Sequence, residues 1–158
     1  MNITVISVGK IKEKYFTAAI DEYSKRLSRF AKLNIIEVAD EKIPDNASEE
    51  EIEQIKEKEG NKILAKLPQN SFVVTLCIEG KEHSSEELAK KIADISMTSS
   101  HITFIIGGSL GLSDTVKSKS ALRLSFGKMT LPHQLMRVVL LEQIYRAFKI
   151  NNNESYHK

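Results

Sequence analysis

Residues 104–111 read Phe-Ile-Ile-Gly-Gly-Ser-Leu-Gly, an apolar run that stops at a pair of glycines. The segment 102–106 is rich in β-branched residues and carries no charge, which is typical of a strand covered on both faces of a parallel sheet. Paired glycines after such a strand remove the Cβ atoms that would keep a ligand from the main chain, although a tight turn explains them equally well. The stretch predicts a central strand with a candidate binding loop at its end.

Strand signals alternate with helix signals along the rest of the chain. Strands are expected at residues 3–8, 35–38, 72–78, 102–106 and 121–126, with Glu79-Gly80 at the exit of the third. Helices are expected at residues 15–30, 48–67, 84–95, 112–119 and 132–148. Capping-box sequences at Ser48 and Ser84 open two of them. This alternation predicts an α/β fold, a mostly parallel sheet with helices on both faces.

Composition limits the possible classes of protein. The chain has 158 residues, of which 41% are hydrophobic, so we expect a single domain over residues 1–158 with a substantial core. A single cysteine, Cys77, cannot form an internal disulfide, and residues 1–8 lack the pattern of a secretion signal. We therefore expect a cytoplasmic protein. No stretch approaches the length of uncharged apolar sequence that a membrane span requires.

Charge is unevenly distributed although the formal net charge is only +2. Residues 40–59 are acidic, whereas residues 10–32 and 117–158 are basic. A basic surface favours an anionic partner such as RNA, but solvated surface lysines explain the pattern as well. Arg137 and Arg146 are candidates for binding RNA phosphates. Arg146 could equally pair with Glu142, four residues before it.

Three strand exits, near residues 78, 107 and 126, are the expected place for a ligand. In parallel α/β sheets, ligands bind beyond the carboxyl ends of the strands. The loop at residues 107–111 matches neither the P-loop nor the dinucleotide-binding pattern, which argues against an ATP- or NAD-dependent enzyme. Four scattered histidines and one cysteine offer no metal-ligand spacing, so no metal is expected. His83 and His101 are expected in surface loops.

The last helix is apolar around most of its circumference. Pro132 suits its first turn, where a missing N–H costs nothing. A helix this apolar must be covered on more than one side. Two readings stay open: it contributes to a homodimer interface, with Leu141 as a contact, or it is a central core helix.

Several motifs, taken together and in order, resemble the RlmH family over essentially the whole chain. They are Ile6-Ser7-Val8-Gly9-Lys10, Ile106-Gly107-Gly108-Ser109, Lys128-Met129-Thr130-Leu131-Pro132-His133-Gln134, Tyr145-Arg146-Ala147 and Tyr156-His157-Lys158. The resemblance implies a SPOUT-class methyltransferase that transfers a methyl group from S-adenosylmethionine to N3 of a pseudouridine in 23S rRNA, on the assembled ribosome. It also implies a homodimer with a carboxyl-terminal trefoil knot.

The resemblance also assigns roles to residues. The cofactor-binding positions that it implies are Leu76, Gly107, Gly108, Phe126, Gly127, Lys128, Met129, Thr130 and Leu131. It implies that the tail is catalytic, with His157 as base or proton relay and Tyr156 bonding or stacking on the target base. The residues alone would favour a frayed polar terminus. The competing function is a non-catalytic RNA-binding module.

Overall fold

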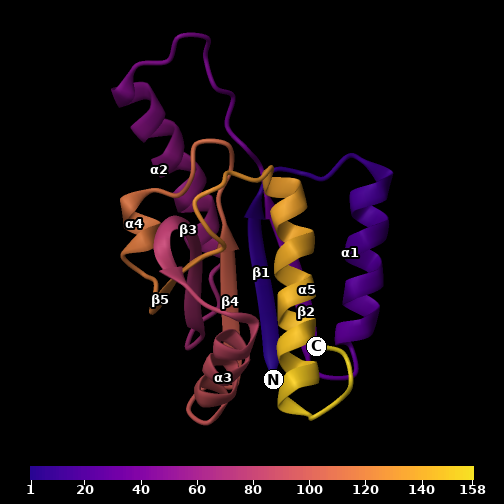
Figure 1. Ribbon diagram of the computed structural model, residues 1–158. Coiled ribbons are helices and arrows are strands. Elements are labelled where there is room, and N and C mark those ends of the chain that lie inside the picture. The colour runs from indigo at the N-terminus through magenta and orange to yellow at the C-terminus, as the bar shows by residue number, and fades with distance from the viewer.

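The computed structural model describes residues 1–158, and its five strands and five helices alternate along the chain (Figure 1). The elements are β1 (Asn2–Val8), α1 (Lys14–Leu27), β2 (Lys32–Val38), α2 (Glu49–Lys66), β3 (Phe72–Glu82), α3 (Ser85–Ser96), β4 (His101–Ile106), α4 (Asp114–Lys117), β5 (Leu122–Ser125) and α5 (His133–Asn151). The strand order is β2-β1-β4-β3-β5, and every pairing is parallel. The α/β prediction is confirmed.

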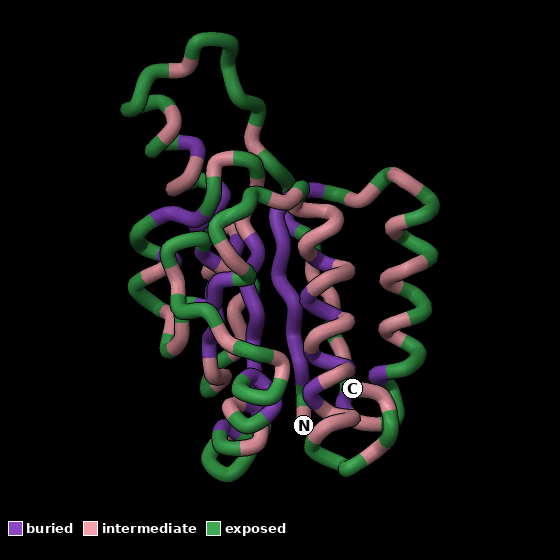
Figure 2. Tube along the Cα trace, viewed as in Figure 1, coloured by how far each residue is buried: buried purple, intermediate pink, exposed green.

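Helices cover both faces of this sheet, as expected. Because successive strand residues point to opposite faces, β1 contributes to two apolar clusters. Ile3 and Val5 pack in a cluster with residues of α3 and α5, whereas Ile6 and Val8 pack with Ile63 of α2 and Val116 of α4. In Figure 2 the central strands are buried along most of their length. Both predicted capping boxes, at Ser48 and Ser84, are present.

Several predicted element boundaries differ by a few residues, and two of these corrections bear on the carboxyl ends of the strands. β3 continues to Glu82, but its pairing with β5 shifts register, so that Leu124 lies opposite both Leu76 and Lys81. Glu79-Gly80 therefore belongs to a bulge. A Cβ at Gly80 would lie 2.7 Å from the carbonyl oxygen of Arg123, so only glycine fits there. Pro132 is the N-cap of α5, one residue before its first turn.

Two further predictions need correction or refinement. His101 is the first residue of β4, and its Nε2 lies 2.7 Å from the Thr4 hydroxyl, so it is not a surface-loop residue. Leu141 is only 1% exposed, within the core that α5 shares with the sheet. This face of α5 is the core helix of the second reading, and Leu141 cannot serve as an interface contact.

Candidate functional site

A cavity of about 740 Å³ lies where β3, β4 and β5 end. Three segments line it, residues 76–79 at the β3 bulge, 106–112 and 126–133, together with side chains of α4 and α5. These are the three strand exits that the sequence indicated. The parallel sheet brings them together because the carboxyl ends of parallel strands meet at one edge.

The cavity contains all but one of the predicted cofactor-binding residues. Those that line it are Leu76, Gly107, Gly108, Phe126, Gly127, Met129, Thr130 and Leu131. Lys128 is exposed and does not line the cavity. The structure thus brings the predicted set together around one space of a size typical for a small-molecule ligand.

Glycines give two of these loops their shape. A Cβ at Gly107 would lie 2.8 Å from the carbonyl carbon of Gly111, so the loop can close on itself only around a glycine. Gly111 has φ +85° and donates its N–H to the Gly108 carbonyl at 3.1 Å. Across the cavity Gly127 has φ +119°, and its N–H donates to Ser125 Oγ at 3.1 Å. Both loops therefore present main chain to the cavity, where a ligand can approach closely.

The cavity rim holds residues that sequence reasoning missed. Lys117 Nζ lies 2.7 Å from Glu79 Oε1, and this ion pair joins α4 to the β3 bulge. The hydrogen bond from Lys117 lowers the pKa of Glu79. Burial raises the pKa of the Cys77 thiol, which argues against a nucleophilic role. Glu79 lies within the register shift of β3, which no sequence pattern predicted.

His133 and Arg137, on the first turns of α5, differ in their surroundings. His133 lines the cavity, where burial, and then the charge of Arg137, lower its pKa, so its imidazole is neutral at neutral pH. The Arg137 side chain is only 3% exposed, and its Nη1 lies 2.6 Å from Glu37 Oε2. Its Nη2 donates to the carbonyls of Val8 and Gly9 at 2.9 and 2.7 Å. Buried in this way, Arg137 cannot reach an RNA phosphate, and that prediction was wrong.

We expect Arg137→Met to lower the free energy of unfolding by about 2–4 kcal/mol, because it leaves Glu37 and two carbonyls without their donor. Urea unfolding of the purified variant measures the change. The matched control is Arg123→Met, since Arg123 is exposed and makes one long bond, 3.4 Å, to a backbone carbonyl. Equal loss in the two variants would contradict the role assigned to Arg137.

The carboxyl-terminal tail is packed against α5. Tyr156 donates its hydroxyl to Glu142 at 2.8 Å, and Arg146 lies over its ring at 4.6 Å. His157 Nε2 lies 2.7 Å from Glu86 Oε1, and its Nδ1 lies 3.2 Å from Arg146 Nη1. Because a guanidinium only donates, Nδ1 accepts from Arg146 and Nε2–H donates to Glu86. The tail is therefore ordered and not frayed.

Arg146 is held inside this arrangement. Its Nη2 lies 2.7 Å from Glu142, and its side chain is 24% exposed. The simple alternative, an ion pair between Arg146 and Glu142, is confirmed, and Arg146 is not free to bind RNA phosphates. Glu154 anchors the tail further, with carboxylate oxygens 2.7 Å from Arg29 and 2.8 Å from Lys149.

The tail does not reach the cavity of its own chain. His157 contacts Arg146, which lies about 20 Å along the α5 axis from His133, at about 1.5 Å of rise per residue. Figure 1 shows the carboxyl terminus beside the far half of α5, away from the end where the cavity loops gather. Within one chain the two parts of the predicted site are thus separate.

Tyr156 should remain a neutral phenol over a wide pH range. Burial and then the hydrogen bond to Glu142 raise the pKa of Tyr156 from 10.0 to about 12. Because the folded pKa is raised, tail docking is fully stabilised below pH 10 and loses that stabilisation as pH rises toward 12. The tyrosinate absorbance that is present in the wild type and missing in Tyr156→Phe belongs to Tyr156. We expect its titration midpoint to lie above the ordinary tyrosine pKa of 10.0. A midpoint near 10 would contradict the docked tail.

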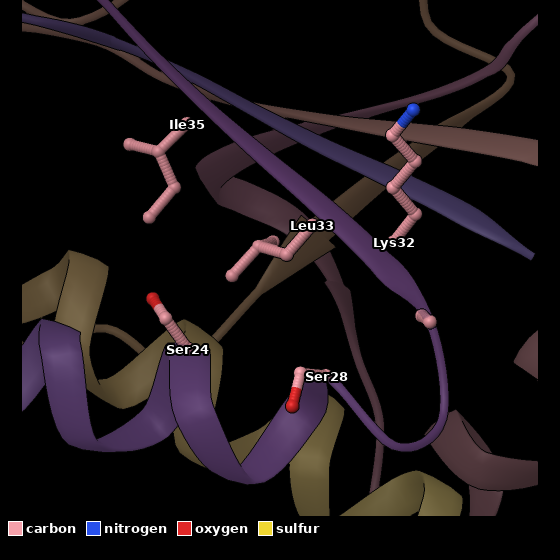
Figure 3. Close-up of a pocket in the computed structure, with 6 residues that line it drawn as sticks. Ser24, Ser28, Lys32, Leu33 and Ile35 are labelled. Atoms are coloured by element: carbon pink, nitrogen blue, oxygen red, sulfur yellow. The ribbon is translucent and has the colours of Figure 1, made fainter.

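A second cavity, of about 570 Å³, lies between α1 and the edge strand β2. Figure 3 shows Ser24 and Ser28 on the helix facing Leu33 and Ile35 on the strand, with Lys32 extending away from them. Its lining holds no acid, histidine or cysteine, and Lys32 is its single charged residue. No cluster of three or more histidine, cysteine or acidic side chains is arranged to hold a metal ion, and none of the helices is long and apolar enough to cross a membrane.

Comparison with known proteins identifies the family by sequence and finds the same fold among solved structures. A family model described as a predicted SPOUT methyltransferase matches residues 1–157. Proteins named ribosomal RNA large subunit methyltransferase H, from Clostridium novyi and Clostridioides difficile, are 62% and 59% identical over the full length of both chains. A tRNA methyltransferase from Aquifex aeolicus shares the fold, with a TM-score of 0.53 at 14% identity over 92% of this chain and 70% of its own. The chain therefore belongs to the SPOUT methyltransferase family, in the group of ribosomal RNA large subunit methyltransferase H proteins.

Proposed function

We propose that this protein methylates N3 of a pseudouridine in 23S rRNA on the assembled ribosome, with S-adenosylmethionine as methyl donor. The observation that carries the proposal is the cavity, since its lining includes the positions that the family resemblance links to the cofactor. The relatives matched over their full length are named for methylation of large-subunit rRNA. One domain over residues 1–158 would carry the activity, and a ribosomal substrate implies the cytoplasm.

The loops at residues 107–111 and 126–131 would hold the cofactor. Their fit to S-adenosylmethionine rests on exposed main chain, because peptide N–H and C=O groups can bond an adenine edge, a ribose or an amino-acid moiety without phosphate-binding features. Bound there, the cofactor supplies an electrophilic methyl group on its sulfonium. Ser125 fixes one loop through bonds to Ile78 O at 2.9 Å and Gly127 N at 3.1 Å. The chain's part is to orient this group toward the RNA base.

The catalytic residues would be Tyr156 and His157, supplied by a second copy of the chain. Because the tail lies about 20 Å along α5 from its own cavity, a homodimer is the simplest way to join them. Leu135, Val138 and Val139 are only half-buried and lie between the two ends. If two α5 helices pair antiparallel across this face, each tail meets the partner's cavity.

The tail would handle the base and its proton. N3 of a uracil ring must lose a proton as it takes the methyl group, and a positioned imidazole can accept it. In His157 the nitrogen that can accept this proton is Nδ1, because Nε2–H donates to Glu86. The N3–H of the uracil ring would replace the Arg146 guanidinium as the hydrogen-bond donor to Nδ1. Tyr156, held neutral by its raised pKa, would donate a hydrogen bond or stack on the ring.

We also propose the trefoil knot that the family resemblance implies. The support is topological: β5 pairs with β3 on the side away from β4, so the chain crosses β3 after β4 and returns to reach α5. The SPOUT family match adds to it. Knots are rare exceptions among connections, which is why alternating patterns cannot predict one.

Transfer of a labelled methyl group from S-adenosylmethionine to ribosomes tests the function directly. Ribosomes from cells lacking this protein should accept label in 23S rRNA, and ribosomes from wild-type cells should not. No transfer to the unmodified ribosomes would refute the enzyme. A non-catalytic RNA-binding module would then remain, binding RNA with steep salt dependence but not the cofactor. ATP or NAD binding would favour a nucleotide-binding enzyme instead.

A further inference from the structure

The loop between β1 and α1, residues 9–13, lies beside the cavity. Gly9 is buried with φ +91°, and a Cβ there would lie 3.6 Å from His133 Nε2. His133 itself lines the cavity. Figure 1 shows the β1–α1 connection running at the same end of the sheet as the start of α5. The loop is therefore part of the border of the candidate active site.

This loop is held in place from both sides. Gly9 N–H donates to the Val38 carbonyl at 2.8 Å, and the buried Arg137 donates to the Gly9 carbonyl at 2.7 Å. Glu37 Oε2, which pairs with Arg137, also accepts the Ile11 N–H at 3.1 Å. An irregular segment anchored at its first and third residues loses little conformational entropy when a partner binds to it.

The loop and the first residue of α1 expose three lysines. Lys10, Lys12 and Lys14 are exposed, whereas Ile11 and Glu13 between them are half-buried. None of the three lysines takes part in an ion pair. Three unpaired ammonium groups thus lie within five consecutive residues at the border of the cavity.

Acidic groups nearby do not cancel this charge. Glu37 is already paired with Arg137. The charges of the exposed Asp40 and of Glu13 partly oppose the lowering of the His133 pKa, so both carboxylates lie near the imidazole. Three lysines against the single carboxylate of Glu13 leave the segment positive. A fixed, positive, unpaired row at the edge of an active site fits a polyanion.

We propose that Lys10, Lys12 and Lys14 form a phosphate-binding rail for the RNA backbone next to the target nucleotide. The proposal rests on the proposed RNA substrate and deepens it, because it names the surface that holds the strand while the base enters the cavity. Arg137 and Glu37 act as positioning residues for this rail. Such contacts carry affinity and register but no base sequence.

The test compares two triple variants that remove the same charge. Lys10→Gln/Lys12→Gln/Lys14→Gln removes the rail, whereas Lys25→Gln/Lys32→Gln/Lys66→Gln removes three exposed lysines at the opposite end of the sheet. Binding of a fluorescein-labelled RNA stem-loop is measured across a salt series. Calorimetry with S-adenosylmethionine and thermal unfolding check that both variants keep the cavity and the fold.

The rail variant should bind the stem-loop at least about tenfold more weakly at low salt. Its salt dependence should also be shallower, with the magnitude of the slope of log K against log salt smaller by about two. The control should change the slope by much less than the rail variant. Equal slopes in the two variants, or no salt-dependent binding by the wild type, would overturn the rail. Methyl transfer by the wild type is measured in parallel, so its absence marks failure of the proposed function and not of the rail alone.

Discussion

Replacing Gly107 by valine is expected to abolish S-adenosylmethionine binding and methyl transfer. The Cβ alone would lie 2.8 Å from the carbonyl carbon of Gly111 and 3.1 Å from its oxygen. Backbone atoms cannot turn aside as a side chain can, so the loop over residues 107–111 must shift. Misplacement of a binding loop by about 1 Å can cost about a hundredfold in rate. Calorimetry with the cofactor and label transfer to ribosomes measure the two losses.

Two other glycines of the same loop allow a graded comparison with that variant. A Cβ at Gly108 meets side-chain atoms of Val8 at 3.1 Å and Glu59 at 3.4 Å, which can move slightly. A Cβ at Gly111 meets no atom within 4 Å, although its φ of +85° makes alanine strained. We expect cofactor affinity to fall least in Gly108→Ala and Gly111→Ala. Wild-type affinity in Gly107→Val would contradict the assignment of this loop.

Replacing His157 by alanine is expected to lower kcat by about 10²–10⁴-fold while cofactor affinity stays at the wild-type value. The reason is that the imidazole would take the N3 proton, whereas it lies too far from its own cavity to support the cofactor loops. The measurement is single-turnover label transfer at saturating S-adenosylmethionine. The control is His83→Ala, since His83 lies just before α3 and contacts only a backbone carbonyl.

Glu86 gives that experiment a second arm. Its carboxylate accepts from His157 Nε2 at 2.7 Å and so sets the tautomer, without touching the base itself. Glu86→Gln should lower kcat less than His157→Ala, because the amide oxygen of glutamine can still accept the Nε2–H bond and keep the tautomer. Full activity in His157→Ala would show that the tail only supports α5.

The fold was largely predictable because its signals are local. Alternating strand and helix patterns, two capping boxes and the apolar run before Gly107 depend on neighbouring residues alone. The β3 bulge was not predictable, since the closest atoms that a Cβ at Gly80 would meet belong to the backbone of Arg123 on another strand. Such a contact between distant segments leaves no periodic trace in the sequence.

The position of the cavity was predictable from the sequence, whereas the partners of the charged groups were not. Residues at strand exits must share one edge of a parallel sheet, so the strand exits near residues 78, 107 and 126 could be grouped from the sequence alone. The partners of Arg137 could not be predicted, because the sequence pattern of an apolar helix is the same whether its arginine faces solvent or Glu37. Its partners come from β2 and β1, 100 and 129 positions away in sequence. The order of the tail likewise depends on contacts across the fold.

The most direct test of a site shared between two subunits is complementation. Gly107→Val and His157→Ala should each be inactive as homodimers, because each loses one part of every site. When the two chains are co-expressed, half of the dimers should be mixed, and each mixed dimer should hold one intact site, giving about a quarter of wild-type methyl transfer. If cavity and tail instead act within one chain, the mixed dimers hold no intact site, because each chain carries one of the two defects. Activity near a quarter supports the account, and absence of methyl transfer in the mixed dimers contradicts it.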